Sequence, residues 1–269
     1  MPVTNLNIAN GALIRIGSPT ITALADTSKE AQICTERLEP CKRTVLRRHP
    51  WNFAMTRVLL SLKSITGAAD NGAGLIRITA VSHGRTTGDY VTVSQVQGTQ
   101  EANGQWTITV INANTFDLQA STFANAYVSG GKVGLAAAFD YEFRHPLPTD
   151  FVRLHTLGRR GDPAWRVEGA YIVCDEEELE LKYVRDVTDY GTMDPSFHDA
   201  LSTYLAWDIC YAITQNLSLK DEIWKDYEKL IRQARFNNAV EEPAETIGAE
   251  GFLDSREGRN SGFVRDPMT

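Results

Sequence analysis

The chain has 269 residues, of which 42% are hydrophobic and 23% are charged, as in ordinary globular proteins. This length allows two modest domains, or one domain with an insert. The net charge of −7, from 27 basic and 34 acidic side chains, argues against a sequence-reading nucleic-acid protein, which usually carries a basic surface.

Targeting and membrane signals are not expected. The segment from Met1 to Gly17 has no basic cluster ahead of an apolar core, unlike a signal peptide. No run approaches the roughly 20 apolar residues that span a bilayer. We therefore expect synthesis in a cytoplasm and no membrane partner.

Charge is unevenly distributed along the chain. Residues 28–63 hold eight Lys and Arg against three acids, whereas residues 134–244 hold twelve against twenty-one. Such polarity can orient neighbouring copies or partners through complementary fields. The alternative is two ordinary solvated surfaces without a partner.

Two helices are expected at the start of the chain. The first runs from about Thr4 to Ile16, where apolar residues recur at helical spacing, and Gly17 ends it. The second begins at a capping box formed by Thr27 and Glu30.

The second helix has two further features. Pro40 lies inside it and is expected to kink it, because proline lacks a backbone donor. Its end is basic, which suits the helix dipole but also suits contact with DNA phosphate or a neighbouring subunit. The candidate contact residues are Lys42, Arg43, Arg47 and Arg48.

Residues 66–133 are predicted to form an all-β insert. Turn signals such as Asn71-Gly72 recur at short intervals, and apolar residues alternate with polar ones between them, as in Trp106-Thr107-Ile108. These patterns predict a small barrel or sandwich of about five to seven strands.

Further strands are expected around the insert. Val58 to Leu62 precede it in extended form, and Leu135 to Asp186 follow it with a clean alternation at Phe139–Phe143. This region is therefore expected to form only a small β region beside the helices.

Two helices are expected after residue 190. Asp194 and Pro195 provide an N-cap and a first-turn proline for one of them, and Ser218 is expected to cap the other. Helices thus lie on both sides of the insert. The apolar faces of these helices have nothing to pack against unless the two ends of the chain come together, so we expect one domain that the insert splits in two.

The last residues, 245–269, form a polar, glycine-containing arm without periodicity. Isolated apolar residues in such an arm suggest ordering against a partner, although a free tail is usually disordered. The residues with this candidate role are Phe252, Leu253, Phe263, Val264 and Arg265.

No sequence pattern indicates catalysis. A phosphate loop and a G-x-S-x-G elbow are both missing, and no two histidines have the spacing of a helical zinc site. The four cysteines form no CxxC pair and are expected to be buried free thiols. We expect no catalytic residue, no metal, no cofactor and no enzyme activity.

The order of several motifs resembles the head-to-tail adaptors of short-tailed bacteriophages, also called tail tubular protein A. The motifs are Asn7–Gly17, Val45–Ala54, Leu147–Arg153, Leu179–Tyr183 and Phe197–Ala206. The insert resembles a β module of several phage tail proteins, which in turn is similar to a domain of ubiquitin-activating enzymes. This resemblance does not imply ubiquitin activation, because the insert contains no cysteine that could act as the catalytic residue.

The resemblance implies a function. Such adaptors form a ring, commonly of twelve copies, beneath the portal protein in the virion. The ring extends the channel for double-stranded DNA, which passes without sequence specificity, and supports the tail nozzle or fibres. The C-terminal residues named above then become candidate portal-binding residues. The alternative functions are a surface- or receptor-binding tail module that acts through the β insert, and a tail-associated hydrolase.

The resulting fold prediction is α+β. It consists of a helical bundle domain with a small β region, interrupted by an inserted β module. The predicted domains are residues 1–65 together with 134–244, the insert 66–133, and the C-terminal arm 245–269.

Overall fold

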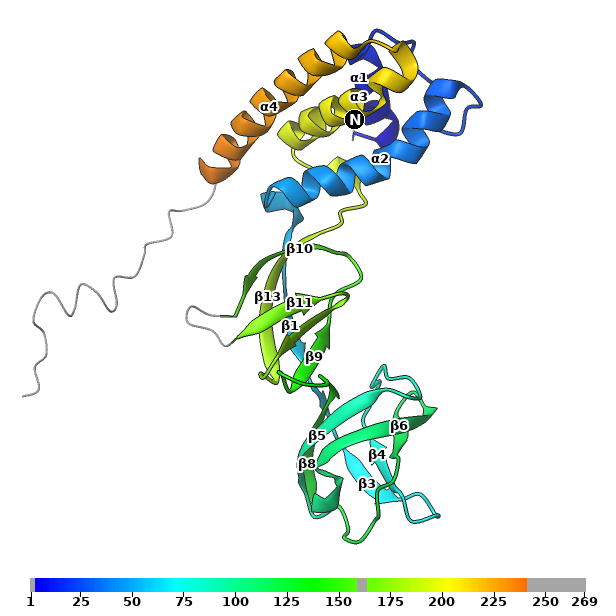
Figure 1. Ribbon diagram of the computed structural model, residues 1–269, viewed down its shortest axis with the longest axis vertical. Coiled ribbons are helices and arrows are strands. Elements are labelled where there is room, and N and C mark those ends of the chain that lie inside the picture. The colour runs from blue at the N-terminus through cyan, green and yellow to red at the C-terminus, as the bar shows by residue number, and fades with distance from the viewer. Residues whose placement is uncertain (1–2, 159–163, 241–269) are drawn as a thin grey trace, which may run out of the picture.

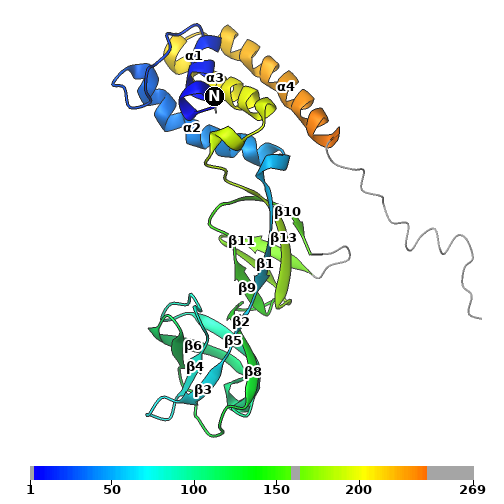
Figure 2. The same cartoon turned by 180° about the vertical axis from the view of Figure 1, so that it is seen from behind.

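The computed structural model describes residues 3–158 and 164–240. In Figure 1 they form an elongated molecule, with helices at one end and two β units following one another away from them. The view from behind in Figure 2 shows the same order. We call these parts the helical unit, the middle β unit and the distal β unit.

The helical unit is built from both ends of the described chain. Its helices are α1 (Asn5–Arg15), α2 (Lys29–Arg48), α3 (Pro195–Thr214) and α4 (Leu217–Val240). α3 packs against each of the other three. Trp51, which follows α2 and is 1% exposed, packs edge-on against Phe197 of α3 with ring centroids 5.0 Å apart. The two halves therefore share one core.

The helix boundaries confirm some predictions and correct others. Asp194 caps α3 as predicted, with Pro195 in the first turn. The capping box predicted at Thr27 is wrong: Ser28 caps α2 and accepts a hydrogen bond from the Ala31 N–H. The cap predicted at Ser218 is also wrong, because α4 begins at Leu217 and the Asn216 side chain accepts from the Leu219 N–H.

The middle β unit combines a small antiparallel sheet with three strands at the end of a longer antiparallel one. The small sheet has the order β1-β13-β10, formed by Met55–Ser61, Glu178–Arg185 and Phe151–Leu157. In the longer one, β12 (Tyr171–Cys174) pairs with β11 (Trp165–Glu168) and with β9 (Phe143–Pro146). The unit has its own apolar core, which includes Ile172 and Leu181.

The strand expected at Phe139–Phe143 is wrong, because only Phe143 belongs to a strand. Asp140 adopts a left-handed backbone with φ of 65°, which breaks the extended run. Phe139 is 77% exposed in this turn.

The distal β unit is a curled antiparallel sheet with the order β8-β5-β6-β7-β4-β3. Apolar residues from several strands, including Ile78, Val91 and Phe116, fill its core. A short strand, β2 (Lys63–Ser64), pairs with β8. The other strands are β3 (Gly67–Asp70), β4 (Ile76–Thr79), β5 (Tyr90–Gln97), β6 (Gly104–Asn112), β7 (Thr115–Leu118) and β8 (Ser129–Ala136).

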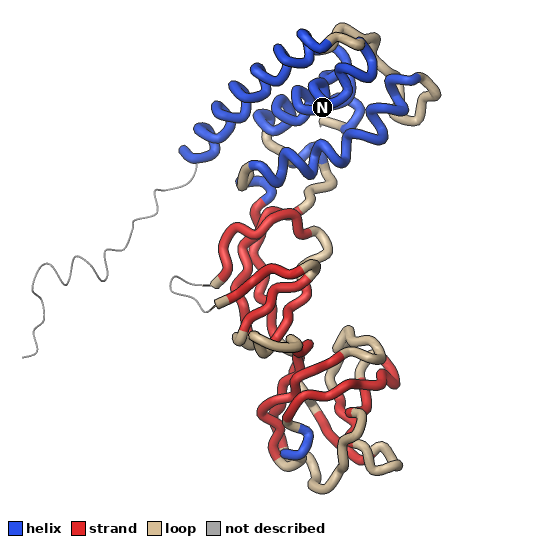
Figure 3. Tube along the Cα trace, in the orientation of Figure 1, coloured by secondary structure: helices blue, strands red, loops and turns tan. Residues whose placement is uncertain are grey.

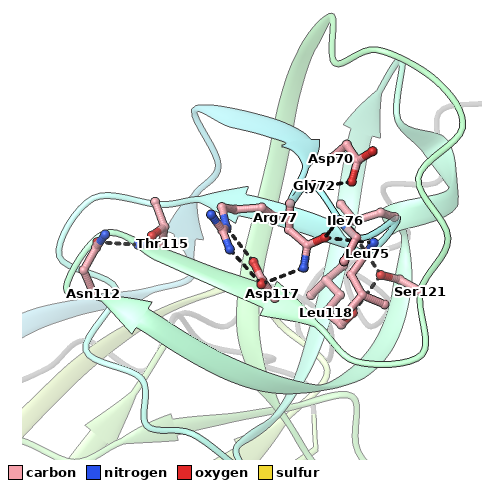
Figure 4. A network of polar contacts seen from close by, with 12 residues as sticks. Asp70, Gly72, Leu75, Ile76, Arg77, Asn112, Thr115, Asp117, Leu118 and Ser121 are labelled. Carbon is pink, nitrogen blue, oxygen red and sulfur yellow. Dashed lines mark hydrogen bonds and ion pairs between the residues drawn. The ribbon is translucent and has the colours of Figure 1, made fainter.

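A polar network holds the β3–β4 turn of the distal unit (Figure 4). Asp117 of β7 accepts hydrogen bonds from Arg77 Nε at 2.7 Å and from Asn71 Nδ2 at 2.9 Å. The Asp70 side chain accepts from the backbone N–H of Gly72 at 2.9 Å. The hydrogen bond from Arg77 lowers the pKa of Asp117. We interpret this network as structural, because Arg77 pairs with Asp117 and the Asp70 carboxylate accepts backbone hydrogen bonds.

The two β units are joined through one continuous sheet. β8 pairs with β9, so that Ala136 lies opposite Phe143. Glu177, in the turn before β13, accepts hydrogen bonds from Lys132 and from Gln95 of the distal unit, both at 2.6 Å.

The predicted fold class is wrong, because it gave the helices too large a share of the fold and the β strands too small a share. The described residues contain four α-helices and thirteen strands, mostly in antiparallel sheets, rather than a helical bundle with a small β region. Figure 3 shows strands filling both β units. The strands outside the insert form a unit with its own core, and sequence alternation alone does not reveal how large such a core is.

Candidate functional site

The basic end of α2 contains one buried cation. Lys42 is 1% exposed, and its Nζ lies 3.0 Å from Asp186 Oδ1 and 2.7 Å from Glu39 Oε2. Its ammonium also lies 5.6 Å from the ring centroid of Tyr190. Lys42 therefore neutralises an internal carboxylate and does not face solvent.

Arg43 and Arg47 are exposed but bonded to the protein. Arg43 Nε donates to Asp186 Oδ2 at 2.8 Å. Burial alone would raise the pKa of Asp186, but the hydrogen bonds from Arg43 and Lys42 bring it below its usual value. Arg47 donates to the Val152 carbonyl at 2.7 Å and thereby ties α2 to β10.

Arg48 lies over a group of aromatic rings. Its guanidinium carbon is 4.8 Å from the ring centroid of Tyr204, 5.3 Å from that of Trp224 and 5.4 Å from that of Tyr227. Guanidinium groups at these distances are attracted by the ring faces. Arg48 thus connects the last turn of α2 to α3 and α4.

Four aromatic side chains form a closed ring of contacts between α3 and α4. Tyr204 and Trp207 have centroids 5.3 Å apart, and Trp207 and Trp224 are 4.8 Å apart. Tyr227 completes the ring, 5.5 Å from Trp224 and 5.2 Å from Tyr204. Offset and tilted pairs of this kind stabilise beyond their buried area.

A pocket of about 380 Å³ opens beside these rings. Arg235 donates from its guanidinium to the Arg48 carbonyl at 3.3 Å and closes one side. The lining contains three cations and one acid, so the pocket is basic. We call it the Arg48 groove; its residues are Arg48, Trp224, Tyr227, Glu228, Ile231, Arg232 and Arg235.

The floor of the Arg48 groove contains a hydroxyl whose own proton is free to donate. Tyr227 is 2% exposed, and its hydroxyl donates no hydrogen bond among the described residues. The Arg48 guanidinium lies close enough to act as a hydrogen-bond donor toward it, which opposes the effect of burial on the pKa of Tyr227. Burial raises the pKa of Tyr227, so the hydroxyl stays protonated and able to donate. The groove therefore combines cations, an apolar floor and a free donor, which suits a carboxylate from a partner.

Sequence analysis did not predict that the residues of this groove lie close together in the fold. Tyr204 and Tyr227 lie in the two helices that were expected after residue 190. A usable signal was present, because Tyr204–Trp207 and Trp224–Tyr227 both have the i, i+3 spacing that places side chains together on a helix.

Groups for covalent or metal chemistry are not gathered in the described residues. No cluster of three or more His, Cys, Asp or Glu there could hold a metal ion. The four cysteines are buried and free, which confirms that prediction. Burial raises the pKa of Cys34 to about 11 and that of Cys41 to about 12, so both are protonated thiols at neutral pH.

The candidate portal-binding residues Phe252, Leu253, Phe263, Val264 and Arg265 lie outside the described residues. Among the described helices, none is long and apolar enough to cross a membrane.

Residues 74–135 match the family model of the ubiquitin-activating enzyme E1 FCCH domain. The match covers β4 through nearly all of β8, which is less than a quarter of the chain. It therefore describes the distal β unit and does not show the family of the whole protein. No curated protein matches the chain.

The predicted kinship with head-to-tail adaptors is wrong, because the matching family model is the FCCH domain and not a phage adaptor family. The motifs behind that prediction lie in ordinary helix and strand segments. Asn7–Gly17 covers most of α1, Leu179–Tyr183 lies within β13 and Phe197–Ala206 lies within α3. Val45–Ala54 covers the end of α2 and the short 3-10 helix Asn52–Ala54. Amphipathic segments of this kind recur in unrelated folds.

Proposed function

We propose that the protein is a structural head-to-tail connector of a tailed phage virion, in which copies form a ring at the portal and extend the DNA channel. The observation that carries the assembly part is the opposite charge of the two ends of α4, with the Arg48 groove at one end. The virion setting is a separate expectation and is tested separately.

α4 is electrically polar along its length. Its first half, residues 217–228, holds four acids and two lysines, whereas residues 229–240 hold three cations and no acid. Asp221 and Glu222 are exposed near its start. At 1.5 Å per residue, roughly 20 Å of helix separates Asp221 from Arg235.

Opposite charges at two ends of one element favour a head-to-tail contact between copies. The Arg48 groove of one subunit would receive Asp221 and Glu222 of the next, because arginine forks bind carboxylates through paired hydrogen bonds. A contact between two different surfaces is heterologous, and it closes into a ring when the rotation per subunit allows.

The arrangement of the units supports this role. Both β units extend away from the helical unit (Figure 1), so a ring made by the helices leaves them free to reach other tail proteins. The exposed guanidinium of Arg47, at the end of α2, remains a candidate contact for passing DNA or a neighbour. We propose no enzyme activity.

A second candidate function is favoured by the distal β unit. Val81 is 61% exposed and Ile111 is 47% exposed in this unit. The loop holding Val81 bonds to the β6–β7 turn, since the Ala80 N–H donates to the Asn114 carbonyl at 2.8 Å. Exposed apolar side chains mark binding surfaces when they gather, which fits a receptor- or surface-binding module.

Assembly can be tested with charge reversals. The double variant Arg48→Glu/Arg235→Glu should abolish oligomers in analytical ultracentrifugation, and so should Asp221→Lys/Glu222→Lys. An equimolar mixture of the two should recover a complex, because each keeps one intact surface. Lys63→Glu, on exposed β2, is the matched control. Wild type that stays monomeric alone and with the portal would refute the proposal.

The virion setting is tested by adding the portal ring of the same virus. A stoichiometric complex, seen as added density beneath the portal in electron micrographs, is the expected result. If oligomers form but the portal never binds, the ring proposal stands and the connector role fails.

A further inference from the structure

Two arginines meet where the distal and middle β units join. Arg85 lies in the loop between β4 and β5 of the distal unit, and Arg144 lies on β9 of the middle unit. Tyr171 of β12 lies beside both. Its ring centroid is 5.1 Å from the Arg144 guanidinium carbon, and its hydroxyl is within electrostatic range of Arg85.

Both guanidinium groups have an unsatisfied buried nitrogen. The Nε atoms of Arg85 and Arg144 are shielded from solvent, and neither has a hydrogen-bond partner among the described residues. A buried donor left unpaired costs about 1–3 kcal/mol, and more when it is charged. Two such donors on neighbouring cations are unusual, since native proteins pair nearly all buried polar atoms.

The surrounding groups neutralise this pair only in part, because Asp89 acts on Arg85 against the like charge of Arg144. Burial lowers the pKa of Arg85, and the charge of Arg144 acts in the same direction. The acid that opposes this shift is Asp89. Both of its carboxylate oxygens are bonded to Thr86, at 2.9 Å to the backbone N–H and at 3.0 Å to the hydroxyl.

The groups packed around the pair hold its position. His83 accepts a hydrogen bond at Nδ1 from the Arg85 N–H at 2.9 Å. His145 is 2% exposed, follows Arg144 on β9 and is bonded through Nε2 to the Glu176 carbonyl at 2.9 Å. Leu135 of β8 lies opposite Arg144 in the sheet. The backbone on both sides of the pair is thus held in place.

We propose that Arg85 and Arg144 bind a small oxyanion of the phosphate or sulfate type, and that this ligand braces the distal β unit against the middle β unit. The planar guanidinium presents N–H donors in a fork that matches oxyanion geometry. One dianion bound by the other guanidinium N–H groups would offset two like charges. Because the arginines come from different units, binding would resist bending between them. This inference does not depend on ring assembly.

The site is tested on the full chain, labelled with ¹⁵N, by titration with inorganic phosphate at constant ionic strength set with sodium chloride. The Nε–H signals of Arg85 and Arg144, assigned with Arg85→Lys and Arg144→Lys, should shift together and saturate. Sulfate should reproduce this result, whereas monovalent acetate should bind at least tenfold more weakly. Absence of saturation, or equal shifts at all arginines, would overturn the proposal.

Thermal unfolding provides a second readout. Phosphate about tenfold above its dissociation constant should raise the melting temperature of wild type by about 3 °C or more over the chloride control. The Lys variants keep the charge but lose the fork, so they should show less than half of that rise. Arg166→Gln, on exposed β11, should keep it. An equal rise in all variants would indicate general salting effects and would contradict the site.

Discussion

The ammonium of Lys42 lies 3.0 Å from the carboxylate of Asp186, although Lys42 is only 1% exposed. This ion pair joins α2 to the segment that follows β13, so it ties the helical unit to the middle β unit. A buried charge is tolerated only when it is paired, and removing one partner leaves the other uncompensated.

Replacing Lys42 should therefore destabilise the protein. Lys42→Ala is expected to lower the free energy of unfolding by about 3 kcal/mol, the low end for a broken buried pair, because Arg43 still bonds to Asp186. Urea unfolding followed by circular dichroism at the helical signal measures this loss. Lys63→Ala on exposed β2 should change the free energy by less than about 0.5 kcal/mol. Equal effects of both variants would refute the role of the pair.

The partly buried His49 should make stability depend on pH. Burial, helped by Arg235 and Arg153, lowers the pKa of His49 to about 4. Between pH 6.5 and 4 the unfolded chain therefore binds more protons, so stability falls as pH falls, by up to about 1.4 kcal/mol per pH unit. Unfolding midpoints in urea at pH 7 and pH 5 should differ clearly in wild type. His49→Gln should reduce this difference, part of which remains because burial also lowers the pKa of His145, and an unchanged difference would contradict the assignment.

Gly134 should be intolerant of a side chain. A Cβ at this position would lie 2.5 Å from Leu62 Cδ2 and 3.0 Å from Phe143 Cδ1, where the two β units meet. Gly134→Ala is expected to cost about 1–3 kcal/mol through overpacking, measured as a lower melting temperature. Gly67→Ala is the matched control, since its Cβ would meet Thr79 at an ordinary 3.6 Å. A control that is as destabilised as Gly134→Ala would remove the steric explanation.

Breaking the Arg77–Asp117 pair should loosen the distal β unit. The Asp117 side chain is 8% exposed and accepts two hydrogen bonds from Arg77, at 2.7 and 2.9 Å. Asp117→Ala is expected to cost about 3 kcal/mol, seen as faster amide exchange in β4 and β7. Glu168→Ala, which breaks a 3.8 Å surface pair, should have little effect. Uniform acceleration across all units would mean that the distal unit is not a separate cooperative part.

Local structure, such as helix capping, was predictable from the sequence. Contacts between residues that are far apart in the chain were not. The Asp194-Pro195 signal predicted the start of α3 correctly, because capping depends on neighbouring residues. Thr27 and Ser28 are adjacent possible caps, and the sequence could not decide between them. Lys42 was expected at the basic end of the second helix as a candidate contact for DNA or a neighbouring subunit, but it is buried against Asp186, which lies 144 positions further along the chain. Arg48 likewise meets Tyr204 and Trp224 only through the tertiary fold.

The size of the β region was missed for a similar reason. The segment from Leu135 to Asp186 was expected to contain further strands, and the structure has Trp165–Glu168, Tyr171–Cys174 and Glu178–Arg185 there. Their joining into a unit with its own core depends on pairings such as Met55 with Val184, which no local pattern encodes. The resemblance to phage adaptors failed because its motifs are short helix and strand segments, and the matching family model is the FCCH domain.

The most direct test of the connector account is a cryo-electron microscopy map of the protein bound to its portal ring. The account predicts a closed ring in which the Arg48 groove of each helical unit faces Asp221 and Glu222 of its neighbour, with both β units outside that contact. A ring held instead through the β units, or no added density beneath the portal, would contradict it.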